Sequence, residues 1–241
     1  MPRNEEHLIL ILGGFLSRPS FYKEMKDQIE SLSGQEVRIV DVRPWQWLSV
    51  SWPRGWIPIL KRLERTITAS QVAKSPRPVT LIGHSLGGVL GYQYLIVSQA
   101  RGDQFKRHSS IRHLVTLGSP HHNQRRWLYG GLVAREVEQW AAKNAPPKNV
   151  MITCIAGKSI RGQAGGSPQN KRAFSIYQKI GGDGNVWGDG IIPVPAALLP
   201  QAKYIVLEGV RHYARSGGLW YGSSGAVNLW WPKIWNDDSR F

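Results

Sequence analysis

The sequence is poor in cysteine, in long apolar runs and in acidic residues. Cys154 is the only cysteine among 241 residues, so no internal disulfide can form, as is usual in a reducing compartment. No apolar run approaches the roughly 18–20 residues that span a bilayer. The run 8–12 is too short for a secretory signal and ends at Gly13 without a cleavage pattern. We therefore expect a cytoplasmic protein with neither a signal peptide nor a transmembrane segment.

The scarcity of acids leaves a strongly basic chain. Sixteen Asp and Glu stand against 31 Lys and Arg, for a net charge of +15, and 11 tryptophans accompany them. Such a field attracts polyanions or anionic lipid surfaces, and tryptophan favours interfaces. Zinc-finger, RNA-binding and basic-zipper patterns are absent, so no nucleic-acid partner is expected. Two interpretations stay open: a solvated basic surface, or peripheral contact with an anionic membrane.

Short apolar runs alternate with longer amphipathic stretches, which is typical of a parallel sheet flanked by helices. The sequence therefore predicts one α/β domain over residues 1–241. The stretch 157–190, rich in Gly, Ser, Lys and Arg, is expected to be a long functional or mobile excursion. Cys154 is expected in the core, inside the apolar run 150–155. The expected strands are 8–13, 36–41 (more polar, near an edge), 78–83, 112–118, 150–156 and 203–207; the expected helices are 19–32, 55–73, 86–99, 124–143 and 224–235, with Pro232 bending or shortening the last.

The most informative motif is Gly83-His84-Ser85-Leu86-Gly87. It lies between an apolar strand and a helical run, which is the context that Gly-x-Ser-x-Gly requires. The turn strains the serine backbone so that the hydroxyl projects above the sheet. Strand and helix then pass so close that the positions of Gly83 and Gly87 must be small. We interpret Ser85 as a nucleophile; the alternative is a glycine-rich turn that closes an ordinary strand–helix unit.

A serine nucleophile needs a base and an orienting carboxylate, which in this architecture follow it in the order acid, then histidine. His212 is the one histidine placed after the last expected strand, at the sheet edge where ligands bind. Asp189, flanked by Gly188 and Gly190, is the favoured acid. Asp183 occupies a similar glycine turn and is the competitor, and Glu208 is the third choice.

The charge that develops on the substrate oxygen needs two backbone N–H donors. We assign one to Leu86, the residue after the nucleophile. The other is assigned to Phe15, in the loop that follows the first strand, with Leu16 as second choice. The same geometry would also fit a plain glycine turn. Gly14, Leu16, His84 and His121 are predicted to contact the substrate.

At four places in order the chain resembles the α/β-hydrolase superfamily, and within it the compact lipases and esterases. Residues 9–15 look like the strand followed by His-Gly-Phe, and residues 83–88 match the lipase form of the nucleophile turn. Leu117-Gly118-Ser119-Pro120-His121 is similar to a Leu-Gly-Thr-Pro-His segment. Gly188-Asp189-Gly190-Ile191-Ile192-Pro193, followed by His212, resembles the acid loop and terminal histidine. The resemblance implies an α/β-hydrolase fold: a mostly parallel sheet of about six strands with helices on both faces.

One position departs from the family pattern, because Gly13 stands where many lipases carry a histidine that buttresses the oxyanion loop. The family also often has a lid after the segment that ends at His121. Here a small lid is expected within 122–148; the alternative is that 125–143 is a helix packed on the sheet.

The sequence thus predicts a carboxylic ester hydrolase that acts on lipid or acyl esters through Ser85, His212 and Asp189 and an acyl-enzyme. No cofactor is required. No metal is expected, because the adjacent His121 and His122 point in different directions without a cluster of further ligands. Two alternatives stay open: a thioesterase or acyltransferase with the same triad, and a non-catalytic ligand-binding member of the fold.

Overall fold

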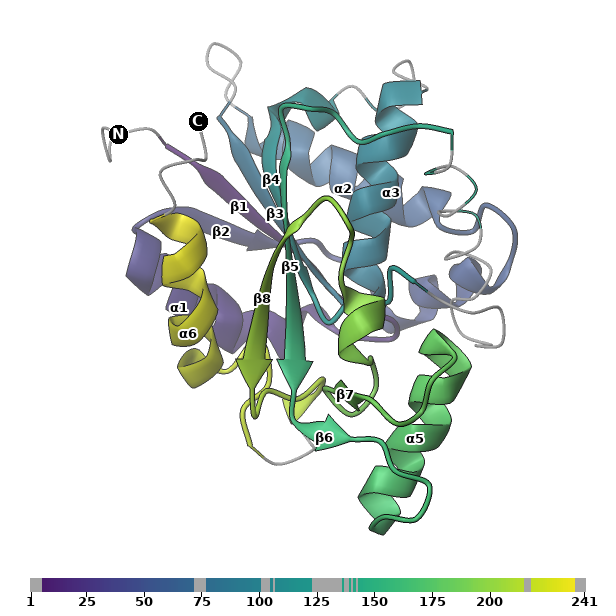
Figure 1. The fold of residues 1–241 in the computed structure, drawn as a ribbon. Helices are drawn as coiled ribbons and strands as arrows, with labels where there is room; N and C mark the ends of the chain where they lie inside the picture. Colours follow the sequence, from purple (N-terminus) through teal and green to yellow (C-terminus); the bar gives the residue numbers. More distant parts are fainter. Residues whose placement is uncertain are drawn as a thin grey trace.

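The computed structural model describes residues 6–71, 77–100, 105, 107–122, 136, 139, 141, 143–214 and 218–236. Its centre is a six-stranded sheet in the order β2-β1-β3-β4-β5-β8, in which every neighbouring pair is parallel (Figure 1). The six expected strands are confirmed, and β2 lies at an edge as its polar sequence predicted. Their bounds are β1 Leu8–Leu12, β2 Glu36–Ile39, β3 Val79–His84, β4 Ile111–Leu117, β5 Met151–Lys158 and β8 Lys203–Glu208.

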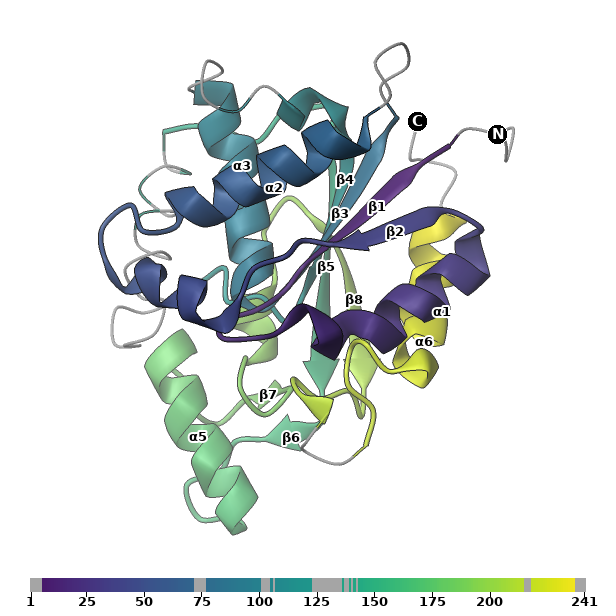
Figure 2. The ribbon, with the colours of Figure 1, turned by 180° about the vertical axis from the view of Figure 1, so that it is seen from behind.

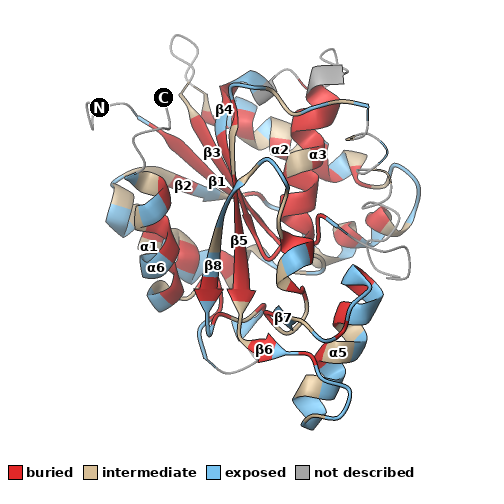
Figure 3. Cartoon of the chain, viewed as in Figure 1, coloured by how far each residue is buried: buried red, intermediate tan, exposed pale blue. Residues whose placement is uncertain are grey.

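Helices cover both faces of this sheet (Figures 1 and 2). Alternate side chains of a strand point to opposite faces, and β1 shows the result. Leu8, Leu10 and Leu12 join the core cluster formed with α2 (Ile57–Ser70) and α3 (Leu86–Ala100). Ile9 and Ile11 join the cluster formed with α1 (Lys23–Ser33) and α6 (Ser224–Trp235). The strand is apolar at every position because both of its faces are buried, as Figure 3 shows for the centre of the sheet.

The expected helices are confirmed for α1, α2, α3 and α6. The first begins with a short 3-10 turn, η1 (Pro19–Tyr22), before α1. The last spans the full predicted range and continues through Pro232, so this proline does not shorten it. The predicted helix 124–143 and the predicted lid 122–148 lie mostly outside the described residues.

The stretch 157–190, expected to be a long functional or mobile excursion, contains regular secondary structure. It holds the two-stranded ribbon β6 (Ile160–Arg161) and β7 (Trp187–Gly188) and the helix α5 (Pro168–Gly181). Ser167 caps α5 by accepting from the N–H of Asn170, and Gly182 ends it in a left-handed conformation with φ 84°. The buried stripe is thin, consisting of Ala173, Tyr177 and Ile180 among basic and polar residues. Because so few of its side chains are apolar, the 3.6-residue spacing of buried positions was not visible in the sequence. The Ser-Pro start and the Gly-Gly stop of the helix were present.

Other segments lie at the ends of the strands. The 3-10 helix η2 (Pro44–Ser51) follows β2, η3 (Arg107–Ser110) precedes β4, and η4 (Val194–Ala197) precedes β8.

Cys154 is buried in β5, as predicted, and burial raises the pKa of its thiol. Within the described part of the chain, no helix combines the length and the apolar character that a bilayer crossing requires.

The core predicts a large difference between two neighbouring positions of α6. Trp230 is fully buried and donates its indole N–H to the Tyr221 carbonyl at 3.0 Å, whereas Leu229 is 45% exposed. Trp230→Ala should lower the free energy of unfolding by about 3–5 kcal/mol because it leaves a cavity. Leu229→Ala should change it by less than about 1 kcal/mol. Urea unfolding measures both, and equal costs would contradict this packing.

Candidate active site

The site is built around Ser85, which occupies the single residue between β3 and α3. Its φ of 54° lies in the left-handed region, which costs a residue with a side chain roughly 1–3 kcal/mol. The surroundings hold this conformation: the Ser85 N–H donates to the Leu117 carbonyl of β4 at 2.8 Å. The strained turn lifts the serine side chain at the carboxyl end of the sheet, as the motif predicted.

Two glycines of the motif are required by close backbone contacts. A Cβ on Gly83 would lie 2.4 Å from the Cα of Gly88. A Cβ on Gly87 would lie 2.3 Å from the carbonyl oxygens of Leu12 and Gly13, at the end of β1. The start of α3 therefore packs directly against the β3 turn and the end of β1, and this packing sets the height of Ser85 over the sheet.

Three buried side chains form a continuous hydrogen-bonded chain. Ser85 Oγ lies 3.0 Å from Nε2 of His212, and Nδ1 of His212 lies 2.7 Å from Oδ2 of Asp189. The exposed fractions are 3% for Ser85, 1% for His212 and 2% for Asp189. With an ionised carboxylate, Nδ1 carries the proton and donates to Asp189, which leaves Nε2 to accept from the serine hydroxyl. The backbone joins the last two residues as well, because the His212 N–H donates to the Asp189 carbonyl at 3.0 Å.

The Asp189 carboxylate has further donors that fix its orientation. Oδ1 accepts from the backbone N–H groups of Ile191 and Ile192 at 2.9 and 2.7 Å. Oδ2 accepts from the Tyr221 hydroxyl at 2.9 Å in addition to His212. A buried carboxylate is tolerated when its lone pairs are satisfied in this way. The loop after Asp189 therefore supplies part of the site, a role that the sequence did not reveal.

Tyr221 is held in place by two glycines. The Gly157 N–H donates to its hydroxyl at 2.7 Å. Gly118 has a φ of 53°, and a Cβ there would lie 2.6 Å from Asp189 Oδ2 and 2.7 Å from the tyrosine oxygen. Burial, and then the charge of Asp189, raise the pKa of Tyr221 well above its ordinary value. The phenol therefore stays protonated and can donate to the carboxylate.

A second tyrosine, Tyr177, supports the acid loop from α5. Its hydroxyl donates to the Ile160 carbonyl at 3.2 Å and accepts from the Gly190 N–H at 2.8 Å. The helix that the composition of 157–190 concealed thus fixes the residue after Asp189. Neither Tyr177 nor Tyr221 belongs to a local motif, so sequence reasoning had no signal for them beyond their aromatic character.

The competing acids lie elsewhere. Asp183 Oδ1 accepts from the Asn185 N–H at 2.8 Å on an exposed turn. Glu208 is exposed and pairs with Nζ of Lys158 at 2.9 Å. These two carboxylates therefore bind Asn185 and Lys158. The carboxylate that meets the His212 imidazole is that of Asp189.

The loop after β1 approaches the serine closely. A Cβ on Gly14 would lie 2.9 Å from the Ser85 Cβ, so this glycine must lack a side chain. Phe15 is half-buried against the α2–α3 core cluster, and Leu16 is 47% exposed with a φ of 58°. Leu86 is buried at the start of α3, where the first N–H groups have no partner within the helix. The residues predicted as oxyanion donors thus flank the serine, one segment on each side.

Tyr22 occupies the space that Gly13 leaves open. A Cβ on Gly13 would lie 2.5 Å from Ser17 Oγ and 2.6 Å from Cε2 of Tyr22. The Tyr22 hydroxyl accepts from the Gly14 N–H at 2.8 Å and lies 2.9 Å from Nδ1 of His84. Burial raises the pKa of Tyr22 far above its ordinary value, so the phenol keeps its proton and can donate to His84. A tyrosine from η1 therefore supports the loop that follows β1.

His84 and His121, predicted to contact substrate, both have their rings in the interior. The His84 ring is fully buried and lies 4.8 Å from the His212 ring between centroids. Burial, and then the neighbouring His212, hold the pKa of His84 well below its ordinary value. His121 Nε2 lies 3.1 Å from Thr116 Oγ1, and burial lowers the pKa of His121 to about 3. Both rings are neutral in this arrangement, and their contact with substrate stays a prediction.

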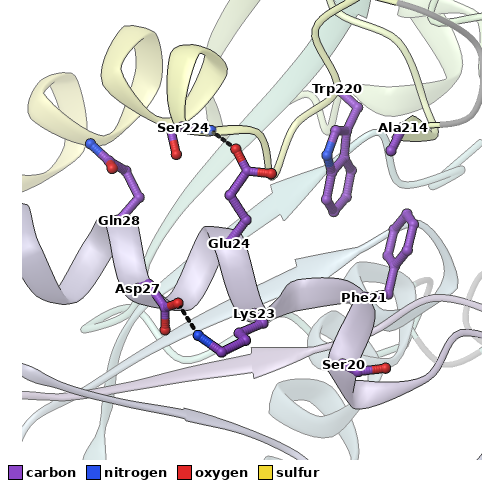
Figure 4. Close-up of a pocket in the computed structure, with 9 residues that line it drawn as sticks. All are labelled: Ser20, Phe21, Lys23, Glu24, Asp27, Gln28, Ala214, Trp220 and Ser224. Carbon is purple, nitrogen blue, oxygen red and sulfur yellow. Dashed lines mark hydrogen bonds and ion pairs between the residues drawn. The ribbon is translucent and has the colours of Figure 1, made fainter.

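A pocket of about 660 Å³, lined by none of Ser85, His212 and Asp189, lies between the start of α1 and the loop before α6 (Figure 4). Phe21 and Trp220 form its aromatic end. Its polar groups bind one another: Lys23 pairs with Asp27, and Glu24 accepts from the Ser224 N–H at 2.7 Å. The Lys23–Asp27 pair lies within α1, whereas the Glu24–Ser224 hydrogen bond joins α1 to α6, so the pocket lies along a seam between the two helices.

A family model described as a PGAP1-like alpha/beta domain matches residues 57–164, less than half of the chain. Among solved structures, a metagenomic carboxyl esterase is 12% identical with a TM-score of 0.56; the match covers 83% of this chain and 62% of that one. A lipase-esterase related protein from Clostridium acetobutylicum is 11% identical with a TM-score of 0.53, over 97% and 95% of the two chains.

No curated protein matches the sequence. The chain spans less than two thirds of the metagenomic esterase. The parallel sheet, the helices on both faces and the likeness to these two structures show the α/β-hydrolase fold.

The support given by Tyr22 predicts the effect of removing one oxygen atom. Tyr22→Phe keeps the ring but leaves the buried Gly14 N–H and His84 Nδ1 without their shared partner. The free energy of unfolding should fall by about 1–3 kcal/mol. Tyr204→Phe, at a position 66% exposed, should leave it unchanged within about 0.5 kcal/mol. Urea denaturation compares the two, and equal stability of both variants would show that the Tyr22 hydroxyl is not a needed partner.

Proposed function

We propose that this chain is a serine hydrolase that cleaves carboxylic esters, with lipid or acyl esters as its substrate class. The observation that carries the proposal is the unbroken hydrogen-bonded chain from Ser85 through His212 to Asp189. A hydroxyl that donates to a neutral imidazole, itself oriented by a carboxylate, is the arrangement that activates a serine for acyl transfer.

The first half of the reaction forms an acyl-enzyme. As Ser85 Oγ attacks the ester carbonyl carbon, its proton passes to Nε2 of His212. The carbonyl oxygen becomes an oxyanion, held by the N–H groups of Leu86 and Phe15. The tetrahedral intermediate then collapses: the bond to the alkoxy oxygen breaks, and His212 gives its proton to the leaving alcohol.

The second half repeats these steps with water. His212 takes a proton from the water as its oxygen attacks the acyl carbon, then returns a proton to Ser85 Oγ when the acid leaves. In both halves Asp189 stabilises the imidazolium through Nδ1, while Tyr221 and the two backbone donors keep the carboxylate in place. The chemistry uses only groups of this chain, the ester and water, so no cofactor is invoked.

Two considerations support an acyl or lipid-like ester. Proteins with the same fold and TM-scores above 0.5 carry the descriptions carboxyl esterase and lipase-esterase related protein. Large apolar side chains are also exposed in segments that follow the strand ends, among them Leu16 at 47% and Tyr213 at 40%. The same triad would also cleave a thioester or transfer an acyl group, and analysis of the products separates these from ester hydrolysis.

Removing the nucleophile should abolish turnover. Wild-type protein should cleave members of a nitrophenyl ester series of graded acyl length, and Ser85→Ala should lower kcat/KM by at least about 10³-fold. Ser20→Ala, an exposed serine in the seam between α1 and α6, serves as the control and should keep wild-type activity. Labelling of wild type, but not of Ser85→Ala, by a fluorophosphonate probe tests the same point. The proposal fails if wild type cleaves no ester of the series, or if Ser85→Ala cleaves as well as wild type.

The choice between the two glycine-flanked acids gives a separate test. Asp189→Asn keeps the shape of the side chain, but its amide N–H₂ can donate to Nδ1 and stabilise the tautomer whose Nε2 carries the proton. That nitrogen could no longer accept from Ser85, so kcat should fall by on the order of 10³–10⁴-fold. Asp183→Asn should leave kcat within about twofold of wild type, since its carboxylate caps an exposed turn. Steady-state kinetics on one ester decides, and the reverse pattern would assign the acid to Asp183.

A further inference from the structure

The segment between β2 and α2 has an apolar outer surface. Its 3-10 helix η2 begins at Pro44 and ends at Ser51. Side chains three residues apart in a 3-10 helix lie on one face. Trp47 and Val50 form the inner face and are fully buried, whereas Trp45 and Leu48 form the outer face, at 64% and 49% exposure. Trp52, directly after the helix, is 63% exposed. We call Trp45, Leu48 and Trp52 the η2 face.

The inner face explains why the outer face is held in a fixed orientation. Trp47 and Val50 belong to the same core cluster as Leu12 of β1 and Leu60 of α2. Their burial fixes η2 on the body of the protein, so the exposed tryptophans cannot turn inward without unpacking that core. Exposing two indole rings to water is unfavourable, and the exposure stabilises no contact within the monomer. An exposed apolar surface of this kind is typical of an interaction site.

All charged residues in the segment that contains the η2 face are basic. Residues 42–63 contain no Asp or Glu, and they contain Arg43, Arg54, Lys61 and Arg62. Arg43 and Arg54 flank the face and are exposed, as is Lys61 near the start of α2. Among the described residues, Glu136 contacts this segment through its carboxylate, which accepts from the Arg54 backbone N–H at 3.2 Å and from the Trp56 indole. The three exposed cations outnumber this carboxylate, so the rim of the face carries a net positive charge.

The η2 face lies at the same edge of the sheet as Ser85. β2, β1 and β3 are parallel neighbours, so the segments after them leave from the same edge. A small cavity is lined by Gly13, Ser17 and Trp47, which shows that the β1 loop and η2 pack side by side. Exposed Leu16 belongs to that loop. In Figures 1 and 2, η2 and the β1 loop lie together at the end of the sheet away from the labelled N-terminus.

We propose that the η2 face is a docking surface for an anionic lipid bilayer, with Trp45, Leu48 and Trp52 entering the headgroup region and Arg43, Arg54 and Lys61 facing its phosphates. Indole rings favour the membrane–water interface because they combine a large apolar body with one N–H donor. Basic side chains beside them are attracted by the negative surface potential of an anionic leaflet. Docked in this orientation, the carboxyl edge of the sheet and the Ser85 side of the molecule face the lipid. Binding by this surface does not depend on the proposed hydrolysis.

Cosedimentation with lipid vesicles tests the proposal. The Ser85→Ala chain is mixed with vesicles of phosphatidylcholine alone, or of phosphatidylcholine with phosphatidylserine as about one third of the lipid. We expect binding to the second kind and at least about tenfold weaker binding to the first, since each basic residue near the surface adds roughly fivefold. Raising the salt concentration should weaken binding to the anionic vesicles.

Two sets of variants locate the contact. Trp45→Ala with Trp52→Ala should weaken binding to the anionic vesicles by about tenfold or more, because the buried indole area is lost. Arg43→Gln with Lys61→Gln should weaken it by roughly tenfold or more and reduce its salt dependence. The matched control is Tyr204→Ala, at 66% exposure in β8, the edge strand opposite β2. It should leave binding unchanged. All substituted side chains are exposed, so the thermal unfolding temperature should match that of the parent, and it is measured for each variant.

Several outcomes would overturn the proposal. Equal binding to both kinds of vesicle, or no binding to either, excludes recognition of an anionic bilayer. A loss shared by Tyr204→Ala, or absent from the tryptophan pair, places the contact elsewhere. A wild-type dimer that the tryptophan pair converts to a monomer, measured by sedimentation equilibrium, makes a second copy of the chain the occupant of the face. Ester cleavage by wild type is assayed separately on a short soluble ester, so a failure of docking and a failure of the proposed function give different results.

Discussion

The contact on which the site depends is the one between the first turn of α3 and the ends of β1 and β3. Gly87 packs on the carbonyl oxygens of Leu12 and Gly13, and Gly83 packs on Gly88. Only hydrogen atoms fit in these gaps, so the backbone itself sets the distance between the three elements. This contact forces Ser85 into a left-handed conformation and places the β1 loop beside it, with Gly14 against its Cβ. The proposed nucleophile and the predicted oxyanion loop are thus positioned by backbone packing, before any side chain of the proposed triad contributes.

Burial of the triad creates a second requirement, which the acid loop meets. A carboxylate taken out of water loses a hydration free energy that a single neutral hydrogen bond does not replace. Asp189 therefore accepts from two backbone N–H groups, from Tyr221 and from His212. The donors also leave it one favourable orientation, with Oδ2 toward the imidazole. Satisfying a buried charge and aiming the histidine are here the same set of contacts.

The sequence predicted the framework well because its signals are local. Six strands showed as apolar runs, the edge position of β2 showed in its polar residues, and the turn at Ser85 showed in its glycines. The sequence favoured Asp189 but kept Asp183 as a competitor, since both are flanked by glycines and read as turn residues by composition. Their difference is tertiary: one faces solvent and the other meets His212. α5 was missed because its three buried side chains, Ala173, Tyr177 and Ile180, lie among basic and polar residues. The roles of Tyr22 and Tyr221 also depend on contacts between segments far apart in the chain, which no local pattern records.

These two tyrosines connect the site to the helices behind it. Tyr22 immediately precedes α1 and supports the loop at Gly14, while Tyr221 precedes α6 and supports Asp189. The helices are joined to each other, since Glu24 of α1 accepts from the Ser224 N–H of α6 and Gln28 donates to Asn228. A shift of α6 relative to α1 would therefore move the support of the acid against the support of the β1 loop, even with the turn at Ser85 unchanged. The relative position of the two halves of the site is thus determined on the face of the sheet that α1 and α6 cover. The pocket between α1 and α6 lies along the contact between these two helices.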